Sequence, residues 1–221
     1  MKKYSLALFI SFVSVFSFAQ VQSGFGIRGG VSTANLKGEA VNNLQNLFEF
    51  TGGAVTTTGR TGFFGGGYVS IPVSDQFTIE PAVYYAQKGY QLRGDLNLKG
   101  IGFLGANAKA QLNTSYIDVP VLAKATINGF QVFAGPQVSY LMGANLRTTA
   151  GALGFNLIDE KMDVTGQINR WDVALTGGVG YQFASGFNVT AAYDHGLSKV
   201  DAGKNLSSYN RAFKVGIGMR F

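Results

Sequence analysis

The decisive stretch of this sequence is residues 187–194, which read Phe-Asn-Val-Thr-Ala-Ala-Tyr-Asp. Large or apolar residues recur at every second position, which is the pattern of a β-strand with one apolar and one polar face. The preceding stretch, Arg170–Phe183, alternates in the same way, and only Ala184–Gly186 separates the two. Two alternating stretches joined by so short a link predict an antiparallel hairpin.

Six further stretches of about ten residues alternate like this pair. That length is what a tilted transmembrane β-strand needs to cross the hydrocarbon layer. In chain order the eight stretches are Gly24–Thr33, Thr61–Ile71, Phe77–Gln87, Thr114–Ile127, Gln131–Gly143, Arg170–Phe183, Phe187–Gly196 and Arg211–Phe221.

The links between these stretches alternate between short and long. The short links are Pro72–Gln76, Asn128–Phe130 and Ala184–Gly186, and the long ones are Ala34–Arg60, Lys88–Asn113, Ala144–Asn169 and Leu197–Asn210. Bacterial outer-membrane barrels combine an even number of strands with short periplasmic turns and longer external loops. The sequence therefore predicts an all-β fold, an eight-stranded antiparallel transmembrane β-barrel.

A soluble β-sandwich or a lipocalin-like barrel would also alternate, so the composition of the two faces has to decide. Charged residues make up only 14% of the chain, about half the usual share of a soluble domain. The polar face is rich in small uncharged residues, whereas a water-facing surface carries many Lys and Glu residues. Aromatic residues near strand ends are typical of the girdles of a lipid-facing surface; they are Phe77, Tyr85, Tyr140, Trp171, Phe183, Phe187, Tyr193 and Phe221. These features favour the membrane barrel.

The first residues have the pattern of a secretory signal peptide. Lys2 and Lys3 precede an apolar segment, Leu6–Phe18, which ends in the small residues Ser17 and Ala19 at the positions that signal peptidase reads. An uncleaved anchor would need a longer apolar stretch. We expect residues 1–19 to be removed and residues 20–221 to form the barrel in the cell outer membrane of a Gram-negative bacterium.

Charge and cysteine content exclude several other classes. The net charge of +6 falls to +4 once the two lysines of the signal peptide are removed, and the basic residues are scattered rather than clustered as nucleic-acid binding requires. The chain has no cysteine. Disulfides, thiolate metal sites and a lipoprotein anchor are therefore all excluded.

The isolated charges on the polar face are expected to point into the barrel. Buried charges are normally paired, and both signs occur near the periplasmic ends (Arg28, Glu80, Lys124, Arg220) and higher up (Asp118, Asp172, Asp194, Lys214). An eight-stranded interior is just wide enough for side chains to fill. We expect a structural charge network that plugs the lumen, with a narrow ion or proton path as the alternative.

Catalytic and ligand-binding patterns are weak. His195, the single histidine, lies near Ser198 and Asp194, but period-two alternation directs Asp194 and His195 to opposite faces, against the geometry of a triad. Gly65–Gly67 lies within a strand and lacks the helix and lysine of a phosphate loop. The carboxylates are too scattered for a metal site. We expect no catalytic residues, no metal and no cofactor.

One apolar segment lies within a predicted external loop. Residues 100–105 are Gly-Ile-Gly-Phe-Leu-Gly, where a solvated loop tip would be polar. Exposed apolar patches often mark interaction sites. Ile101, Phe103 and Leu104 are therefore candidate contacts for a partner, or else a lid over the barrel mouth.

Several segments together resemble the PorT-like outer-membrane β-barrel family, whose members are often labelled porin-like. The likeness covers essentially the whole mature chain in short motifs, namely Tyr116–Lys124, Phe133–Pro136, Tyr193, Gly196–Ser198 and Phe213–Phe221. The resemblance implies an eight-stranded barrel without catalytic residues, and a link to protein secretion.

Three functions remain open at this stage. The leading hypothesis is a non-enzymatic envelope protein that is structural or binds an envelope partner through its external loops. A low-conductance, porin-like channel is the alternative, and a lipid-modifying enzyme is the third hypothesis. Outer-membrane lipid and, during biogenesis, the barrel assembly machinery are the other expected partners.

The final strand generates a prediction about assembly. Phe213 and Phe221 begin and end its outward apolar row, and a terminal aromatic residue resembles the signal read by the barrel assembly machinery. Deleting Phe221 should therefore lower the amount of folded protein in outer-membrane fractions, measured by gel migration with and without boiling. Normal levels of the deletion variant would contradict this role.

Overall fold

A computed structural model describes residues 23–38, 54–96, 106–152, 155–201, 203 and 207–221. The predicted signal peptide and the candidate contacts Ile101, Phe103 and Leu104 lie outside these residues. The described elements are antiparallel strands and one short 3-10 helix. They are β1 (Gly24–Gly38), β2 (Ala54–Pro72), β3 (Phe77–Leu96), β4 (Ala106–Ile127), β5 (Phe130–Ala152), β6 (Phe155–Asp163), η2 (Thr165–Gln167), β7 (Trp171–Gln182), β8 (Phe187–Lys199) and β9 (Ser208–Arg220).

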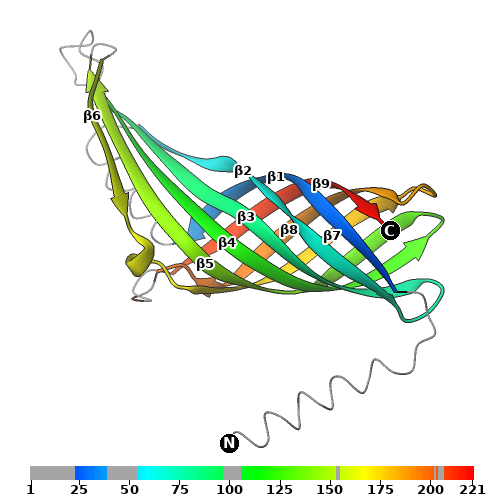
Figure 1. Cartoon of the computed structure of the whole chain (residues 1–221). Helices are drawn as coiled ribbons and strands as arrows, with labels where there is room; N and C mark the ends of the chain where they lie inside the picture. Colours follow the sequence, from blue (N-terminus) through cyan, green and yellow to red (C-terminus); the bar gives the residue numbers. More distant parts are fainter. Residues whose placement is uncertain (1–22, 39–53, 97–105, 153–154, 202, 204–206) are drawn as a thin grey trace, which may run out of the picture.

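Eight of these strands close into a ring (Figure 1). Sequential neighbours pair from β1 to β5, β5 then pairs with β7, and β9 returns to pair with β1. The predicted all-β, eight-stranded antiparallel barrel is thereby confirmed. In the part of the chain that the structure describes, no helix has the length and apolarity to cross a membrane.

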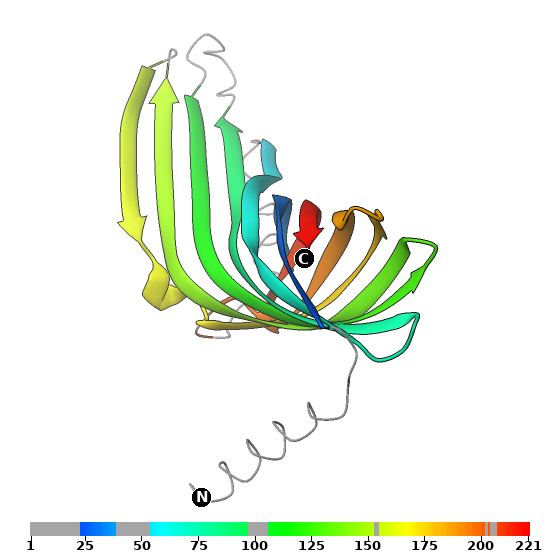
Figure 2. The ribbon, with the colours of Figure 1, turned by 45° about the vertical axis from the view of Figure 1, so that its right-hand side comes forward.

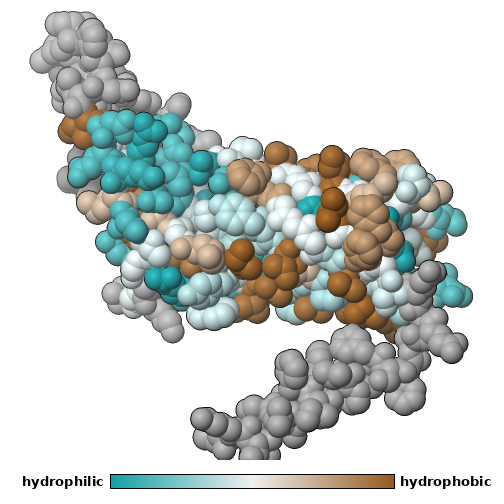
Figure 3. Space-filling view, viewed as in Figure 1, coloured by the Kyte–Doolittle hydropathy of each residue, from teal (hydrophilic) through white to brown (hydrophobic). Residues whose placement is uncertain are grey.

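Side chains alternate between the lumen and the outer surface along each strand of the ring. The eight aromatic residues assigned to the outer face by the sequence pattern are all exposed, by 37% to 61%. Aromatic rings meet near both ends of the barrel: Phe221 contacts Phe25 near one end, with ring centroids 5.3 Å apart, and Tyr140 contacts Trp171 near the other, at 5.0 Å. Figure 3 shows hydrophobic residues over the barrel and hydrophilic residues on the part that extends beyond it.

The turns at one end of the barrel are short for a local reason. Between β4 and β5, Asn128 and Gly129 both have positive φ values, 52° and 83°. That conformation belongs to the type I′ turn, whose twist matches that of the strands it joins and which favours the sequence Asn-Gly. This end is the periplasmic end, because periplasmic turns are short.

At the opposite end the structure differs from the predicted long loops. β2, β3, β4 and β5 continue past the ring as a free sheet, and β6, which the alternation pattern missed, extends this sheet by pairing with β5 (Figure 2). Apolar and polar residues do not alternate clearly in these strand segments, because outside the bilayer both sheet faces meet water and the residues are mostly polar. We call this part, β6 together with the strand segments that continue beyond the ring, the protruding sheet.

The segment that follows β6 runs beside β5 at the outer end of the ring. Val164 and Ile168, on either side of η2, are buried in a cluster with Tyr116, Leu141 and Ala144. The backbone N–H of Val164 donates to the carbonyl oxygen of Ala144 at 3.0 Å, which fixes the start of this cap. Residues 164–168, which we call the mouth cap, thus lie where the sequence predicted only a loop.

Two adjacent glycines of β1, Gly29 and Gly30, differ in how much space surrounds them, and this difference can be tested by substitution. A Cβ atom at Gly30, which faces the lumen, would lie 2.0 Å from the carbonyl oxygen of Val215, whereas at Gly29, on the outer face, its nearest neighbour would be 3.4 Å away. Overpacking typically costs about 1–3 kcal/mol. Gly30→Ala should lower the free energy of unfolding by that amount, and Gly29→Ala should leave it nearly unchanged.

Urea titration of the refolded barrel in detergent micelles, read by heat-modifiable gel migration, provides the measurement. Equal effects of the two variants would show that crowding at the strand contact is not what selects glycine at position 30.

Candidate functional site

The lumen holds eight buried charged residues among those the structure describes. Four are basic and four are acidic, so their formal charges cancel: Arg28, Lys88, Lys124 and Lys214 against Glu80, Asp118, Asp172 and Asp194. The balance fits the high cost of burying an unpaired ion. These residues form three layers along the barrel.

The lower layer, near the periplasmic end, is centred on Glu80. Arg28 donates to one oxygen of this carboxylate at 2.8 Å, and Lys124 donates to the other. Arg28 also donates to the Tyr84 hydroxyl at 2.9 Å and lies over the ring of Tyr68. Both carboxylate oxygens are therefore paired, and the surplus positive charge is shared with aromatic rings.

The middle layer is centred on Asp118, which is fully buried. Lys88 and Lys214 donate to its two oxygens at 3.0 and 3.1 Å. Lys214 also lies 2.6 Å from Asp194, whose second oxygen accepts a hydrogen bond from Thr176 at 2.9 Å. Sequence reasoning missed Lys88 because it placed the residue in a loop. Lys88 continues the inward row of β3, which consists of Glu80, Ala82, Tyr84 and Ala86. This position in the alternation could have predicted that Lys88 points into the lumen.

In the upper layer, Asp172 is held by neutral groups. Asn210 and Ser198 each donate to one of its oxygens at 2.5 Å, and Tyr90 donates in turn to the side-chain oxygen of Asn210. Asp172 therefore has no direct cation partner among the described residues, unlike the other three buried acids.

Apolar side chains separate the lower and middle layers. Phe64, Leu122 and Phe133 meet there, and the space left between them has a volume of about 30 Å³. A single water molecule needs roughly 10–15 Å³ of such volume. At this level the described lumen is therefore nearly filled by side chains.

Arg220, the last residue predicted to join the network, is exposed at the periplasmic rim and forms no ion pair with a described residue. It borders a polar vestibule of about 340 Å³ that also touches Lys124, Gln131 and Gln182. Its place in the alternation is inward, and it lies at the end of β9 beside the same vestibule as Glu80 and Lys124, without an ion pair to a described carboxylate.

The candidate triad does not come together. Asp194 is buried in the lumen, whereas His195 is exposed on the outer face beside Tyr193. Ser198 donates to Asp172 rather than contacting His195. In the described parts of the chain, no group of three His, Cys, Asp or Glu residues could hold a metal ion.

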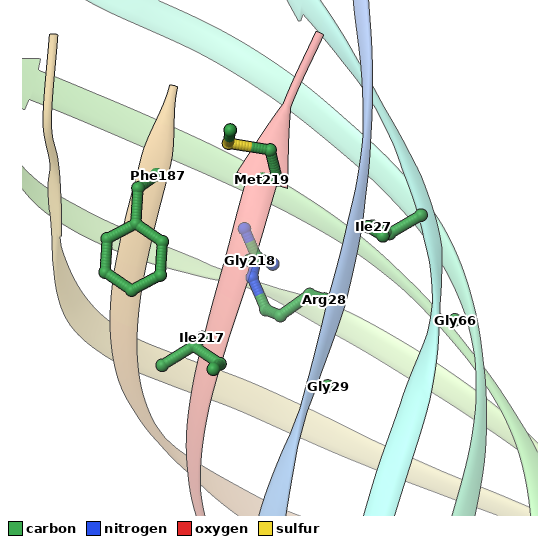
Figure 4. A pocket seen from close by; sticks show the side chains of 8 residues that line it. All are labelled: Ile27, Arg28, Gly29, Gly66, Phe187, Ile217, Gly218 and Met219. Atoms are coloured by element: carbon green, nitrogen blue, oxygen red, sulfur yellow. The ribbon is translucent and has the colours of Figure 1, made fainter. Parts of the chain in front are cut away.

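The outer surface has a shallow apolar groove of about 660 Å³ across β1, β8 and β9. Ile27, Phe187, Ile217 and Met219 border it, and Arg28 reaches from β1 towards Gly218 of β9 (Figure 4). The groove belongs to the lipid-facing belt, where hydrocarbon would fill it.

In the protruding sheet, an exposed ion pair joins β6 to β5. Arg147 donates to the two oxygens of Asp159 at 2.8 and 2.6 Å. These hydrogen bonds, together with the positive charge of Arg147, lower the pKa of Asp159 below its ordinary value. This ion pair adds to the backbone ladder that joins β6 to β5.

A closed barrel with an apolar outer belt and a filled interior defines an integral outer-membrane barrel protein. The sequence comparison agrees: the pattern of the outer membrane protein beta-barrel domain family matches residues 18–202. The chain belongs to this family, and its location is the cell outer membrane. No protein of curated function matches it.

Solved structures similar to this chain include three outer-membrane proteins. The attachment invasion locus protein Ail of Yersinia pestis, solved with the heparin analogue sucrose octasulfate, is 12% identical, with 91% of this chain and 100% of that one covered and a TM-score of 0.45. Neisserial surface protein A is 11% identical, with coverages of 90% and 99% and a TM-score of 0.41. OprG of Pseudomonas aeruginosa is 16% identical, with coverages of 90% and 96% and a TM-score of 0.38.

The lower layer generates a double-mutant prediction. Glu80→Gln leaves Arg28 and Lys124 buried without their acid and should cost about 3–5 kcal/mol of unfolding free energy. Lys124→Met should cost less, because Glu80 keeps Arg28. The double variant should be more stable than the sum of the two losses predicts. Strictly additive losses in urea titrations would contradict the coupling.

Proposed function

We propose that this chain is a non-enzymatic outer-membrane protein that binds a protein partner outside the cell through its protruding sheet. One observation carries the proposal: the sheet continues beyond the barrel and ends at β6, which pairs with β5 and with no other described strand. An unpaired strand edge presents a row of backbone donors and acceptors to another chain. Addition of an extended segment to such an edge is a common mode of protein recognition.

The side chains of β6 fit a binding edge. Ile158 and Met162 are each 52% exposed, although they lie in a polar region. Met162 lies between Lys161 and Asp163, and Asp159 follows Ile158. Charged residues along an edge strand limit indiscriminate association. The exposed apolar side chains would add contact area to a strand paired through its backbone.

Transport is the less supported function. The three charged layers and the apolar layer between them occupy the described lumen, and Val164 and Ile168 of the mouth cap pack against Tyr116 and Leu141 at its outer end. A low-conductance path would require these paired ions to separate.

An enzymatic function has no support from the placement of the candidate residues. The candidate nucleophile Ser198 is bound to Asp172, and His195 points towards lipid. Nucleophilic catalysis needs the nucleophile and its base within hydrogen-bond reach.

A finer assignment rests on sequence resemblance alone. The stretch Tyr116–Lys124 supports placement among the PorT-like barrels, and a partner in protein secretion would follow from that placement. The barrel assembly machinery, reading Phe213 and Phe221, is proposed as a partner during biogenesis only.

Site-specific photo-crosslinking in living cells tests the binding edge. A benzoylphenylalanine introduced at Met162 should give a protein adduct on irradiation, whereas the same group at Val215, on the lipid-facing surface, should give none. Ile158→Lys in the Met162-labelled chain should weaken the adduct, because an added charge blocks edge pairing.

The mass of the adduct identifies the partner as another protein or a second copy of this chain. Absence of any protein adduct from Met162, in cells where the barrel is folded and exported, would overturn the proposal.

A further inference from the structure

The periplasmic end of the lumen opens into the polar vestibule of about 340 Å³ that Arg220 borders. Segments far apart along the chain line it: the β2–β3 turn supplies Asp75, β4 supplies Lys124, β5 supplies Gln131 and β9 supplies Arg220. Glu80 and Lys124, from the lower charged layer, line it as well. Its volume lies at the lower end of the range for small-molecule sites.

The charges around the vestibule do not balance. Glu80 is shared between Arg28 and Lys124, so one carboxylate faces two cations. Arg220 adds a third cation, which has no ion pair with a described carboxylate. Asp75, exposed on the turn, is the second acid. Three cations therefore face two acids, and one negative charge from a ligand would complete the balance.

Two of these cations have N–H donors for such a charge. An ammonium group has three donors, and the described residues take one of those of Lys124, through Glu80. The guanidinium of Arg220 offers a planar fork of donors that matches a carboxylate. The backbone N–H of Arg220 donates to the carbonyl oxygen of Gly186 in the β7–β8 turn at 2.9 Å, which holds this residue at the rim beside the short turns (Figure 1).

Gln131 makes a different demand on a ligand. This residue is 5% exposed, and its side-chain oxygen has no hydrogen-bond partner among the described residues. An unpaired buried acceptor is costly. Because an amide exchanges its oxygen and nitrogen on a half-turn of its last torsion angle, Gln131 can present the acceptor to the vestibule that it lines. A ligand with an N–H group would satisfy this acceptor, whereas a simple anion such as acetate would not.

We propose that the vestibule binds the free carboxyl end of a short periplasmic peptide. The terminal carboxylate supplies the missing negative charge between Arg220 and Lys124, and the last peptide N–H group donates to Gln131. Capture of a C-terminal carboxylate is a recurring mode of peptide recognition. The site lies at the end of the barrel opposite the protruding sheet, so this inference goes beyond the proposed function and does not depend on it.

Matched ligands test the two contacts on the unaltered protein. In ligand-observed NMR titrations of the refolded mature chain in detergent micelles, N-acetyl-Ala-Ala should bind with a Kd on the order of 1 mM, as expected of so small a ligand. Its C-terminal amide lacks the charge, and its ester analogue has an oxygen atom in place of the last N–H group. Each should bind about tenfold more weakly. Equal affinities for the acid and the amide, or no binding of the acid, would overturn the proposal.

Variants locate the contacts within the vestibule. Arg220→Gln should weaken binding of the acid about tenfold and leave the affinity for the amide unchanged. Arg211→Gln, at the other end of β9 and outside the vestibule, is the matched control and should change neither affinity. Gln131→Met should weaken binding of the peptide but not of the ester analogue. Heat-modifiable migration verifies that each variant has folded.

Unchanged binding of the acid by folded Arg220→Gln would show that the carboxylate binds elsewhere, and the site would be wrong. If Gln131→Met does not fold, the comparison of peptide and ester on the unaltered chain still decides the N–H contact, and equal affinities there would remove Gln131 from the site.

Two periplasmic sources offer this chemistry, and stereochemistry distinguishes them. The stem peptides of the cell wall end in a D-amino acid, whereas proteins end in an L-amino acid. Tighter binding of N-acetyl-D-Ala-D-Ala than of its L-form would support the proposal with the cell wall as the source. The reverse preference would support it with the C-terminus of a protein as the source. The result of photo-crosslinking at Met162 bears on the protruding sheet alone, so either proposal can fail while the other stands.

Discussion

The whole architecture depends on one requirement: inside a bilayer every backbone N–H and C=O group must find its partner within the protein. A sheet meets this requirement only when its two edges are joined, and here β9 pairs with β1 along the full height of the barrel. Closure with eight strands fixes a narrow interior. Because the interior is narrow, many of the residues that face it are glycines or other small residues.

The narrow interior also explains why the buried charges are arranged in matched layers. In the described part of the lumen these acids are buried among side chains, so neighbouring side chains must satisfy each of them. Glu80 and Asp118 each bind two cations, whereas Asp172 relies on an amide and a hydroxyl. Ion pairs of this kind contribute little net stability over apolar packing, but losing one member is costly.

The alternation of apolar and polar residues was enough to predict the strands of the ring. Each of these strands separates lipid from lumen, so its two faces differ sharply in polarity. The alternation failed for β6, whose two faces both meet water. It also failed for Lys88, which lies just beyond the point where the outward apolar row ends. The contact between Glu80 and Lys124 could be predicted, because both residues have inward positions in the alternation and lie equally far from their turns. The exposure of Arg220 depends instead on where β9 ends relative to the periplasmic rim. Shear between strands, which no single-sequence pattern reports, decides such cases.

The seam between β1 and β9 has a kinetic consequence. Phe25 stacks against Phe221 across it, and no other pair of neighbouring strands in the ring is so widely separated along the chain. Closing so long a loop carries the largest entropic cost in the ring, and folding slows as such distant contacts come to dominate. Until β9 has been made, the edge of β1 is an open template for other chains. The yield of inserted protein therefore depends on the rate at which β9 pairs with β1 relative to the rate of aggregation. The thermodynamic stability of the finished barrel does not enter this comparison of rates.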